Sequence, residues 1–151
     1  MGKLTIAKVE FLTVVGAVGA FISSLFGGWD EALTTLVIVM AIDYLTGLIV
    51  AGVFHKSKKS ENGGLESRAG WKGVCRKCVT LLMVLVAVRL DLTIGTNFIK
   101  DGVVIAFIAT ETISIFENLG LMGVRIPSVL EKAIDILQKK SEKVDGVDDS
   151  K

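Results

Sequence analysis

Four stretches of the chain are long, apolar and almost free of ionisable side chains. They cover about residues 9–28, 32–54, 78–99 and 102–118. The hydrocarbon core of a bilayer is about 30 Å thick and needs roughly 20 apolar residues per helix. The pattern therefore predicts an all-α integral membrane protein with four transmembrane helices. A mean hydropathy of +0.61 agrees with this class.

The stretches differ in how readily each would enter a bilayer alone. The second has twelve Leu, Ile, Val and Phe residues against one aspartate, and the third has twelve against two charges. The fourth has only eight against two carboxylates. A charge at the centre of a helix costs about 2.5 to 3.5 kcal/mol on an insertion scale. We therefore expect the third and fourth helices to insert as a hairpin, or only with their polar groups turned toward partners.

The first stretch has an alternative interpretation as a cleaved signal peptide. A basic N-terminus precedes it, and the small residues at 18–20 offer a weak cleavage site. However, the run from Phe11 to Gly28 has 18 residues without an ionisable side chain, which is long for the core of a signal peptide. We favour a membrane span. The protein has three transmembrane helices if this stretch does not cross.

Basic residues are distributed unevenly between the links. The link at residues 55–77 carries seven, whereas the two links on the opposite side together carry one. An excess of Lys and Arg marks the cytoplasmic side of a membrane protein. Both termini are therefore predicted to be cytoplasmic, on the same side as this basic loop. The seven residues are Lys56, Lys58, Lys59, Arg68, Lys72, Arg76 and Lys77.

A second region follows the predicted transmembrane domain of residues 1–125. It covers residues 126–151 and opens after Pro127 with Ser128-Val129-Leu130-Glu131, a capping box that favours the start of a helix. The helix is expected to reach about Lys140, with an amphipathic pattern that suits a membrane surface or a partner. The charged ending at 143–151 is expected to be disordered. The apolar face consists of Val129, Leu130, Ala133, Ile134 and Leu137.

Ionisable residues inside predicted membrane helices indicate function or a specific contact. Counting 1.5 Å per residue places Asp43, Arg89 and Glu111 near one depth. One hypothesis is a cluster in which Arg89 neutralises one or both carboxylates, within one chain or between chains. The alternative is that Arg89 extends to the membrane surface and pairs locally with Asp91.

Two further patterns suggest helices that associate. A polar stripe on the fourth helix cannot face lipid, so it must face other helices or water. Small residues at intervals of four let helix backbones approach closely. Packing within one monomer is an alternative to oligomers for each of these faces. The stripe holds Thr110, Glu111, Ser114, Glu117 and Asn118, and the small residues are Gly16, Ala20, Ser24 and Gly28 on the first helix and Gly47 and Ala51 on the second.

The residues of the chain do not favour an enzyme. Cys75 and Cys78 form a CxxC pair, but zinc would need two more ligands and His55 is the only histidine. A structural role is the favoured interpretation of the two cysteines, and reversible oxidation is the alternative. No catalytic set, cofactor site or metal site is predicted. The net charge of +1 gives no indication of nucleic-acid binding.

Three stretches together resemble the small phage holins of the toxin secretion/phage lysis group. The first is Asp43-Tyr44-Leu45-Thr46-Gly47. The second is the basic, glycine-spaced run of Ser67, Gly70, Gly73, Arg76 and Lys77. The third is residues 111–118 followed by Gly123 and Ile126-Pro127. The likeness covers about residues 32–140, and the order and spacing of the stretches carry it more than any single motif.

The resemblance implies a function that the residues alone do not. Such proteins assemble into homo-oligomers in the bacterial inner membrane and open lesions. A cell-wall hydrolase, or in some settings a large toxin, then leaves the cell. On this hypothesis Glu111, Ser114, Glu117 and Asn118 line the lesion. The alternatives are a small ion- or proton-coupled transporter, with Asp43 or Glu111 as a relay, and a membrane anchor for a cytoplasmic partner.

Overall fold

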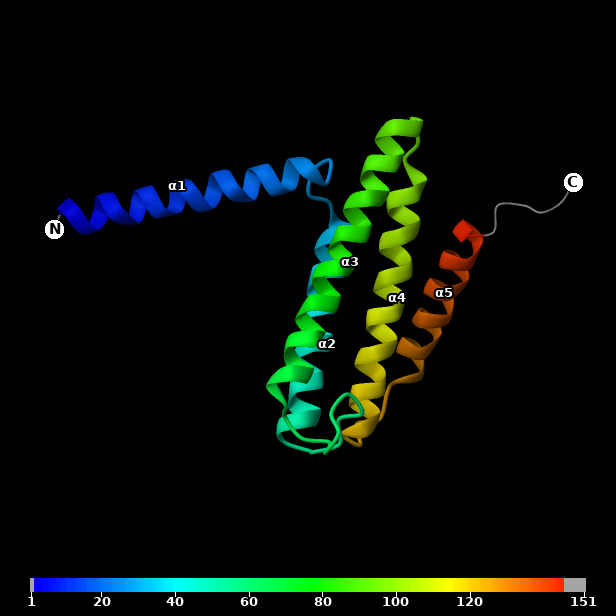
Figure 1. The fold of residues 1–151 in the computed structure, drawn as a ribbon. Coiled ribbons are helices and arrows are strands. Elements are labelled where there is room, and N and C mark those ends of the chain that lie inside the picture. Colours follow the sequence, from blue (N-terminus) through cyan, green and yellow to red (C-terminus); the bar gives the residue numbers. More distant parts are fainter. Residues whose placement is uncertain (1, 146–151) are drawn as a thin grey trace, which may run out of the picture. The chain divides into compact units, whose positions relative to one another are not determined.

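The computed structural model describes residues 2–145, with side chains described for residues 6–140. This part of the chain contains five helices and no strand (Figure 1). The all-α prediction is therefore confirmed. The helices are α1 (Gly2–Leu25), α2 (Glu31–Gly52), α3 (Ser67–Ile94), α4 (Phe98–Leu121) and α5 (Ser128–Asp145).

The chain divides into two compact units, residues 1–30 and 31–151. The first unit is α1 with its C-terminal turn. Gly27 and Gly28 adopt positive φ angles just after the helix, in the left-handed region that glycine tolerates. All side chains from residue 6 to residue 22 are exposed although most are apolar. A helix that is apolar all round and unburied within its own unit is suited to a lipid environment.

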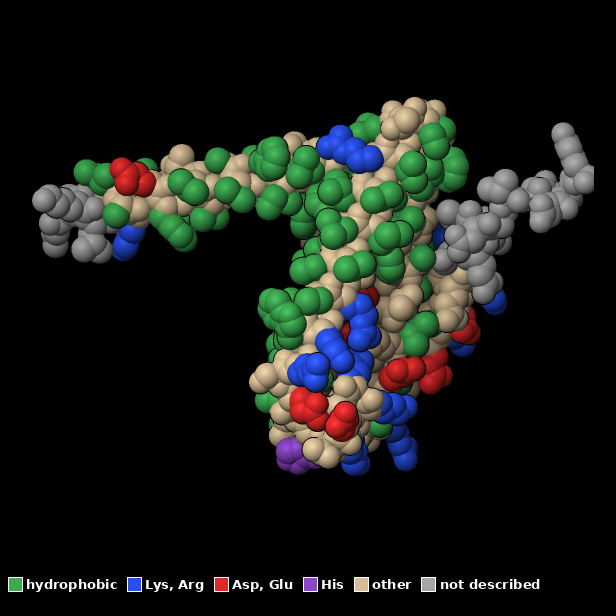
Figure 2. All heavy atoms as spheres, viewed as in Figure 1, with side chains coloured by type: hydrophobic (Ala, Val, Ile, Leu, Met, Phe, Trp, Pro, Cys, Tyr) green, Lys and Arg blue, Asp and Glu red, His purple; other side chains and the backbone are tan. Residues whose placement is uncertain are grey.

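In the second unit, α4 is the central helix. Helices α2, α3 and α5 all pack against it, whereas α2 and α3 touch over only a short stretch. Fully buried Leu33, Leu36, Val84 and Val104 form the core. Large apolar side chains are also exposed on α2 and α3, and those on α3 are green in Figure 2. The unit is thus apolar both inside and outside, as expected in a bilayer.

Two helical segments are long and apolar enough to cross a membrane, namely Ile6–Leu25 and Glu31–Gly52. Only 28% of the second segment is buried within the protein, so it does not resemble the core helix of a soluble domain. Helices α3 and α4 are not among these segments; α3 carries basic residues at its start together with Arg89 and Asp91, and α4 carries two carboxylates in its apolar stretch. These features support membrane localisation, and four crossings remain a prediction.

The boundaries of the third helix differ from the sequence-based ones. Helix α3 begins at Ser67, eleven residues before the predicted start at residue 78, and ends at Ile94 with Gly95 at a φ of 78°. Hydropathy detects only the apolar part of a helix, while Lys and Arg are good helix formers and extend it. The loop is therefore limited to residues 53–66. Four of the seven predicted loop cations, Arg68, Lys72, Arg76 and Lys77, lie on α3 instead.

Backbone contacts hold the remaining loop in a folded turn. The amide of Ser57 donates a hydrogen bond to the carbonyl of Gly63 at 2.9 Å. Gly63 has a φ of 72°, and a Cβ at this position would lie 2.3 Å from the His55 carbonyl oxygen. Only glycine therefore fits here.

The predicted C-terminal helix is present and extends to Asp145, beyond the expected end near Lys140. It packs against α4, and of its predicted apolar face Ile134 is buried whereas Val129 and Leu130 are exposed. Residues 146–151 of the charged ending lie outside the described part of the chain.

Candidate functional site: a charged cluster between three helices

A lysine from α3 joins two carboxylates from the neighbouring helices. The Lys77 ammonium donates to Asp43 Oδ2 of α2 at 2.8 Å and to Glu111 Oε2 of α4 at 2.5 Å. The three side chains are 17%, 8% and 13% exposed, respectively. This charged cluster links the three long helices of the second unit through one cation.

The three residues lie at matching depths. Asp43 is nine residues before the end of α2, Lys77 is ten residues after the start of α3, and Glu111 is ten residues before the end of α4. At 1.5 Å per residue, each is about 14 to 15 Å from the loop end of its helix. This is about half the thickness of a hydrocarbon core. If the helices cross a bilayer, the charged cluster lies near its midplane.

An amide extends the cluster along the contact between α2 and α4. The Asn118 side chain donates to Asp43 Oδ1 at 3.2 Å, to the Asp43 carbonyl oxygen at 3.3 Å and to Thr46 Oγ1 at 3.0 Å. Gly47 lies beside this amide: a Cβ there would be in ordinary contact with Asn118 Nδ2 at 3.8 Å, so only a larger side chain would crowd it. Asp43 thus receives hydrogen bonds from both α3 and α4, which compensate for the loss of water around a buried carboxylate.

The charges of the cluster do not balance. Two carboxylates share one ammonium, so the group carries a formal charge of −1 when all three residues are ionised. In a bilayer such an excess charge is expensive unless polar groups or water surround it. Ser114 and Thr110 of α4 line the same space as the three charged residues and supply hydroxyl groups there.

A cavity connects the cluster with the loop end of the unit. Its volume is about 170 Å³, and residues of α2, α3, α4 and the loop line it. Tyr44, Gly47 and Ala51 form part of the α2 wall, and Lys59 and Glu66 belong to the loop side. The structure therefore provides a hollow through which water can reach Asp43 and Glu111.

The cation of this cluster is not the one predicted from the sequence. Arg89 is exposed and takes part in neither of the two salt bridges among the described side chains, residues 6–140. It is five residues from the end of α3 at Ile94, about 8 Å from that end, whereas Lys77 lies level with the carboxylates. The prediction that Arg89 neutralises Asp43 or Glu111 is wrong within the chain. The version between chains stays a prediction.

The alternative prediction, a local salt bridge between Arg89 and Asp91, is also wrong within the chain. Asp91 is 6% exposed and accepts hydrogen bonds from the start of α4. Its Oδ1 accepts from Thr96 Oγ1 at 2.6 Å and from the Ile99 amide at 3.1 Å, and its Oδ2 accepts from the Lys100 amide at 2.8 Å. Asp91 thus acts as the N-cap that Asn97, which makes no side-chain capping bond, does not provide. This clamp joins α3 and α4 into a hairpin.

The predicted polar stripe of α4 is divided between two environments. Glu111 bonds to α3 and Asn118 bonds to α2, whereas Ser114 and the exposed Thr110 line the cavity. Glu117 is exposed. Within the single chain, part of the stripe therefore serves packing.

The predicted small-residue contacts also differ between helices. Ala51 is 7% exposed and Gly47 lies against Asn118, so the face of α2 packs within the unit. Gly16, Ala20 and Ser24 of α1 are exposed, and nothing lies within 4 Å of a Cβ built at Gly16. A contact role for the α1 face stays a prediction.

Sequence reasoning missed Lys77 because hydropathy placed it in a loop. A signal was nevertheless present. Lys77, Thr80, Val84, Val88 and Asp91 follow each other at helical spacings of three or four residues, and all are buried or partly buried. Continuing the helical period upstream from the apolar stretch would have put Lys77 on the inner face.

The other predicted loop cations and the two cysteines lie in the cavity wall or on the surface. Lys59 and Arg76 line the cavity with Lys77. Cys75 and Cys78 are exposed free thiols on α3. Among the described residues, no group of three or more His, Cys, Asp or Glu side chains could hold a metal ion. Of the seven basic residues predicted for the loop, the other four are exposed, namely Lys56, Lys58, Arg68 and Lys72.

These features define the class of the protein: an all-helical membrane protein whose long helices are tied by buried charges. The sequence matches the Bacteriophage holin family over residues 20–139, and the chain belongs to this family. A probable holin of Bacillus phage phi105 is 31% identical over 81% of this chain and 85% of its own length. No solved structure gives a significant match.

Bacterial relatives resemble the chain over similar lengths. An uncharacterized protein of Listeria monocytogenes is 37% identical over 82% of this chain and 83% of its own length. An uncharacterized 14.9 kDa protein of Clostridium perfringens is 37% identical over 82% and 89%. The resemblance to holins expected from the sequence is therefore confirmed at the level of the family.

Proposed function

We propose that this protein is a holin that forms oligomers in the bacterial inner membrane and opens lesions through which a cell-wall hydrolase or a large toxin leaves the cell. The match to the Bacteriophage holin family over residues 20–139 carries this proposal. The fold supports it, because the protein combines exposed apolar helices with polar groups that are buried between helices in the single chain.

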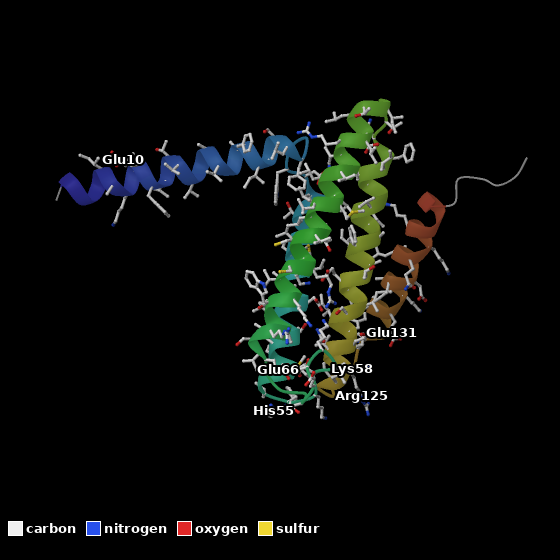
Figure 3. The ribbon with its side chains drawn as sticks, in the orientation of Figure 1. Glu10, His55, Lys58, Glu66, Arg125 and Glu131 are labelled. Carbon is white, nitrogen blue, oxygen red and sulfur yellow. The ribbon has the colours of Figure 1, made fainter. Side chains whose placement is uncertain are left out.

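The proposed topology has four membrane crossings, α1 to α4, with both termini in the cytoplasm. Figure 3 shows His55, Lys58 and Glu66 at the same end of the second unit as Arg125, which follows α4. Figure 2 shows several Lys and Arg side chains gathered toward this end. The positive-inside rule assigns it to the cytoplasm. The Asp91 clamp supports insertion of α3 and α4 as a hairpin, since it joins their far ends.

The charged cluster suggests how a closed form is held. In the single chain, Lys77 engages Asp43 and Glu111, so the charges of these groups are paired between the helices and do not face lipid. Chains first associate through exposed apolar faces, among them the small residues Gly16, Ala20 and Ser24 of α1. At a critical density the helices rearrange. Glu111, Ser114, Glu117 and Asn118 of α4 then line a water-filled lesion.

Timed induction of the protein in a bacterial host tests this function. The membrane potential should stay constant for a defined period and then collapse, and lysis should follow when a cell-wall hydrolase is co-expressed. Lys77→Met should change the time of collapse, because it leaves two buried carboxylates without their cation. Lys72→Met on the same helix is the matched control, because Lys72 is exposed. A steady potential with no lysis at any expression level would contradict the proposal.

The cavity favours one alternative, a small ion- or proton-coupled transporter or its subunit. Asp43 and Glu111 lie at one end of a hollow that reaches the loop, an arrangement suited to a proton relay. Such a protein would change ion flux across vesicles without lysing cells. Asp43→Asn would then abolish flux while leaving growth unaffected.

A further inference from the structure

Two hollows of different character adjoin at the loop end of the second unit. The first is the cavity described above, which is lined by charged residues. The second is a more open groove of about 340 Å³ between α2 and the start of α3, lined largely by apolar side chains. Both are lined by Tyr44, Leu48, Leu65, Glu66 and Gly70, so they lie next to each other and share these walls. A space with a charged part and an apolar part fits an amphipathic ligand.

Two glycines of α3 keep this space open. A Cβ at Gly70 would lie 3.6 Å from the Tyr44 hydroxyl, and one at Gly73 would lie 3.5 Å from the Tyr44 ring. An alanine would just fit at either position, whereas a longer side chain would enter the space between α2 and α3. These two helices touch over only a short stretch, because both pack mainly against α4.

The charged part offers two further cations, Lys59 from the loop and Arg76 from α3 beside Lys77. Lys59 and Arg76 line the cavity, and neither takes part in the salt bridges among the described side chains, residues 6–140. Lys77, in contrast, is engaged by both carboxylates. Arg and Lys side chains that converge on one space suit a phosphate group. Glu66 on the same wall can accept a hydrogen bond from a hydroxyl or ammonium of the ligand.

The apolar part opens toward the outside of the unit. Trp71 is 69% exposed and Leu65 is 63% exposed, although both line a hollow. Tryptophan is enriched at the membrane–water interface, where a helix end lies next to lipid headgroups and the first part of the acyl chains. A ligand that enters the groove from this side therefore comes from the membrane.

We propose that this space binds one glycerophospholipid of the inner leaflet. Lys59 and Arg76 hold its phosphate, and an acyl chain lies in the groove beside Tyr44, Leu48 and Trp71. The bound lipid fills the gap between α2 and α3, so it acts as a structural partner of the closed unit. This inference rests on the membrane topology of the proposed function and not on the formation of lesions.

Native mass spectrometry of the full chain, extracted in mild detergent and supplied with phosphatidylglycerol or phosphatidylethanolamine, tests the proposal. The wild type should retain one phospholipid per chain. The double variant Lys59→Gln/Arg76→Gln should lower this retention about tenfold. The matched control is Lys58→Gln/Arg68→Gln, which removes two exposed cations that do not line the cavity. Equal losses in both double variants would reduce the effect to general surface charge and overturn the proposal.

Blocking the groove provides a second, independent measurement. Gly70→Leu should abolish retention, whereas Gly120→Leu should not, because nothing lies within 4 Å of a Cβ at Gly120. Circular dichroism of both variants establishes that they are helical. Retention in a helical Gly70→Leu variant would overturn the proposal. So would displacement of the lipid by inorganic phosphate at the concentration of added phospholipid.

The outcome is separable from that of the lysis experiment. A chain that lyses cells on schedule but retains no phospholipid refutes the lipid site alone. A chain that retains a phospholipid but never collapses the membrane potential refutes the holin function alone.

Discussion

Asp91→Ala removes the acceptor that caps α4 from the preceding helix. The wild-type carboxylate accepts hydrogen bonds from the amides of Ile99 and Lys100 and from the hydroxyl of Thr96. An ordinary N-cap is worth about 1 kcal/mol, and a hydrogen bond to a charged group contributes about 1.5 to 3 kcal/mol. Because Asp91 is 6% exposed, water replaces these bonds poorly. We expect a loss of about 3 kcal/mol, roughly a 150-fold rise in the unfolding constant.

The assay is equilibrium unfolding in mixed micelles with increasing sodium dodecyl sulfate, followed by circular dichroism. Amide hydrogen exchange provides a local measurement, because the amides of Ile99 and Lys100 should exchange faster in the variant. Asp91→Asn should lose less stability than Asp91→Ala, because one acceptor oxygen remains. It should still lose some, because the negative charge near the start of α4 is removed.

Asp101→Ala is the matched control. Asp101 is also acidic and lies in the first turn of α4, but it is exposed. Its interaction with the helix dipole is worth less than about 1 kcal/mol. If Asp91→Ala destabilises the protein no more than Asp101→Ala, the clamp is not a stabilising contact and the reasoning fails.

Three further predictions concern single positions. Lys77→Met should destabilise the second unit by about 3 to 5 kcal/mol because two buried carboxylates lose their cation, and thermal unfolding with Lys72→Met as control measures this loss. Gly63→Ala should make the loop sensitive to limited proteolysis, because the new Cβ would overlap the His55 backbone. Gly64→Ala should not, because its Cβ would be in ordinary contact with the His55 ring at 3.5 Å. Gly47→Leu should separate α2 from α4 and lower the melting temperature, while Gly47→Ala should leave it nearly unchanged, because a Cβ there is in ordinary contact with Asn118.

The common depth of Asp43 and Glu111 could be predicted from the sequence, but the depths of Arg89 and Lys77 and the partner of each carboxylate could not. Asp43 and Glu111 were placed at one level because depth follows from residue number at a constant rise per residue. Pairing also depends on how each helix is rotated and where its neighbours begin. Lys77 pairs with both carboxylates because α3 starts at Ser67, and Arg89 faces outward near the other end.

The sequence by itself predicted a membrane environment and an all-helical chain, although not where α3 begins. A residue pattern that is apolar on every side of a helix leaves few alternatives to a bilayer, and the charge bias predicts which side is cytoplasmic. Only the tertiary structure decided that Lys77 closes the charged cluster, that Asp91 caps α4, and that Gly70 and Gly73 leave a hollow beside Tyr44. These contacts join residues far apart on different helices, and periodicity along one helix contains no information about the rotation of another.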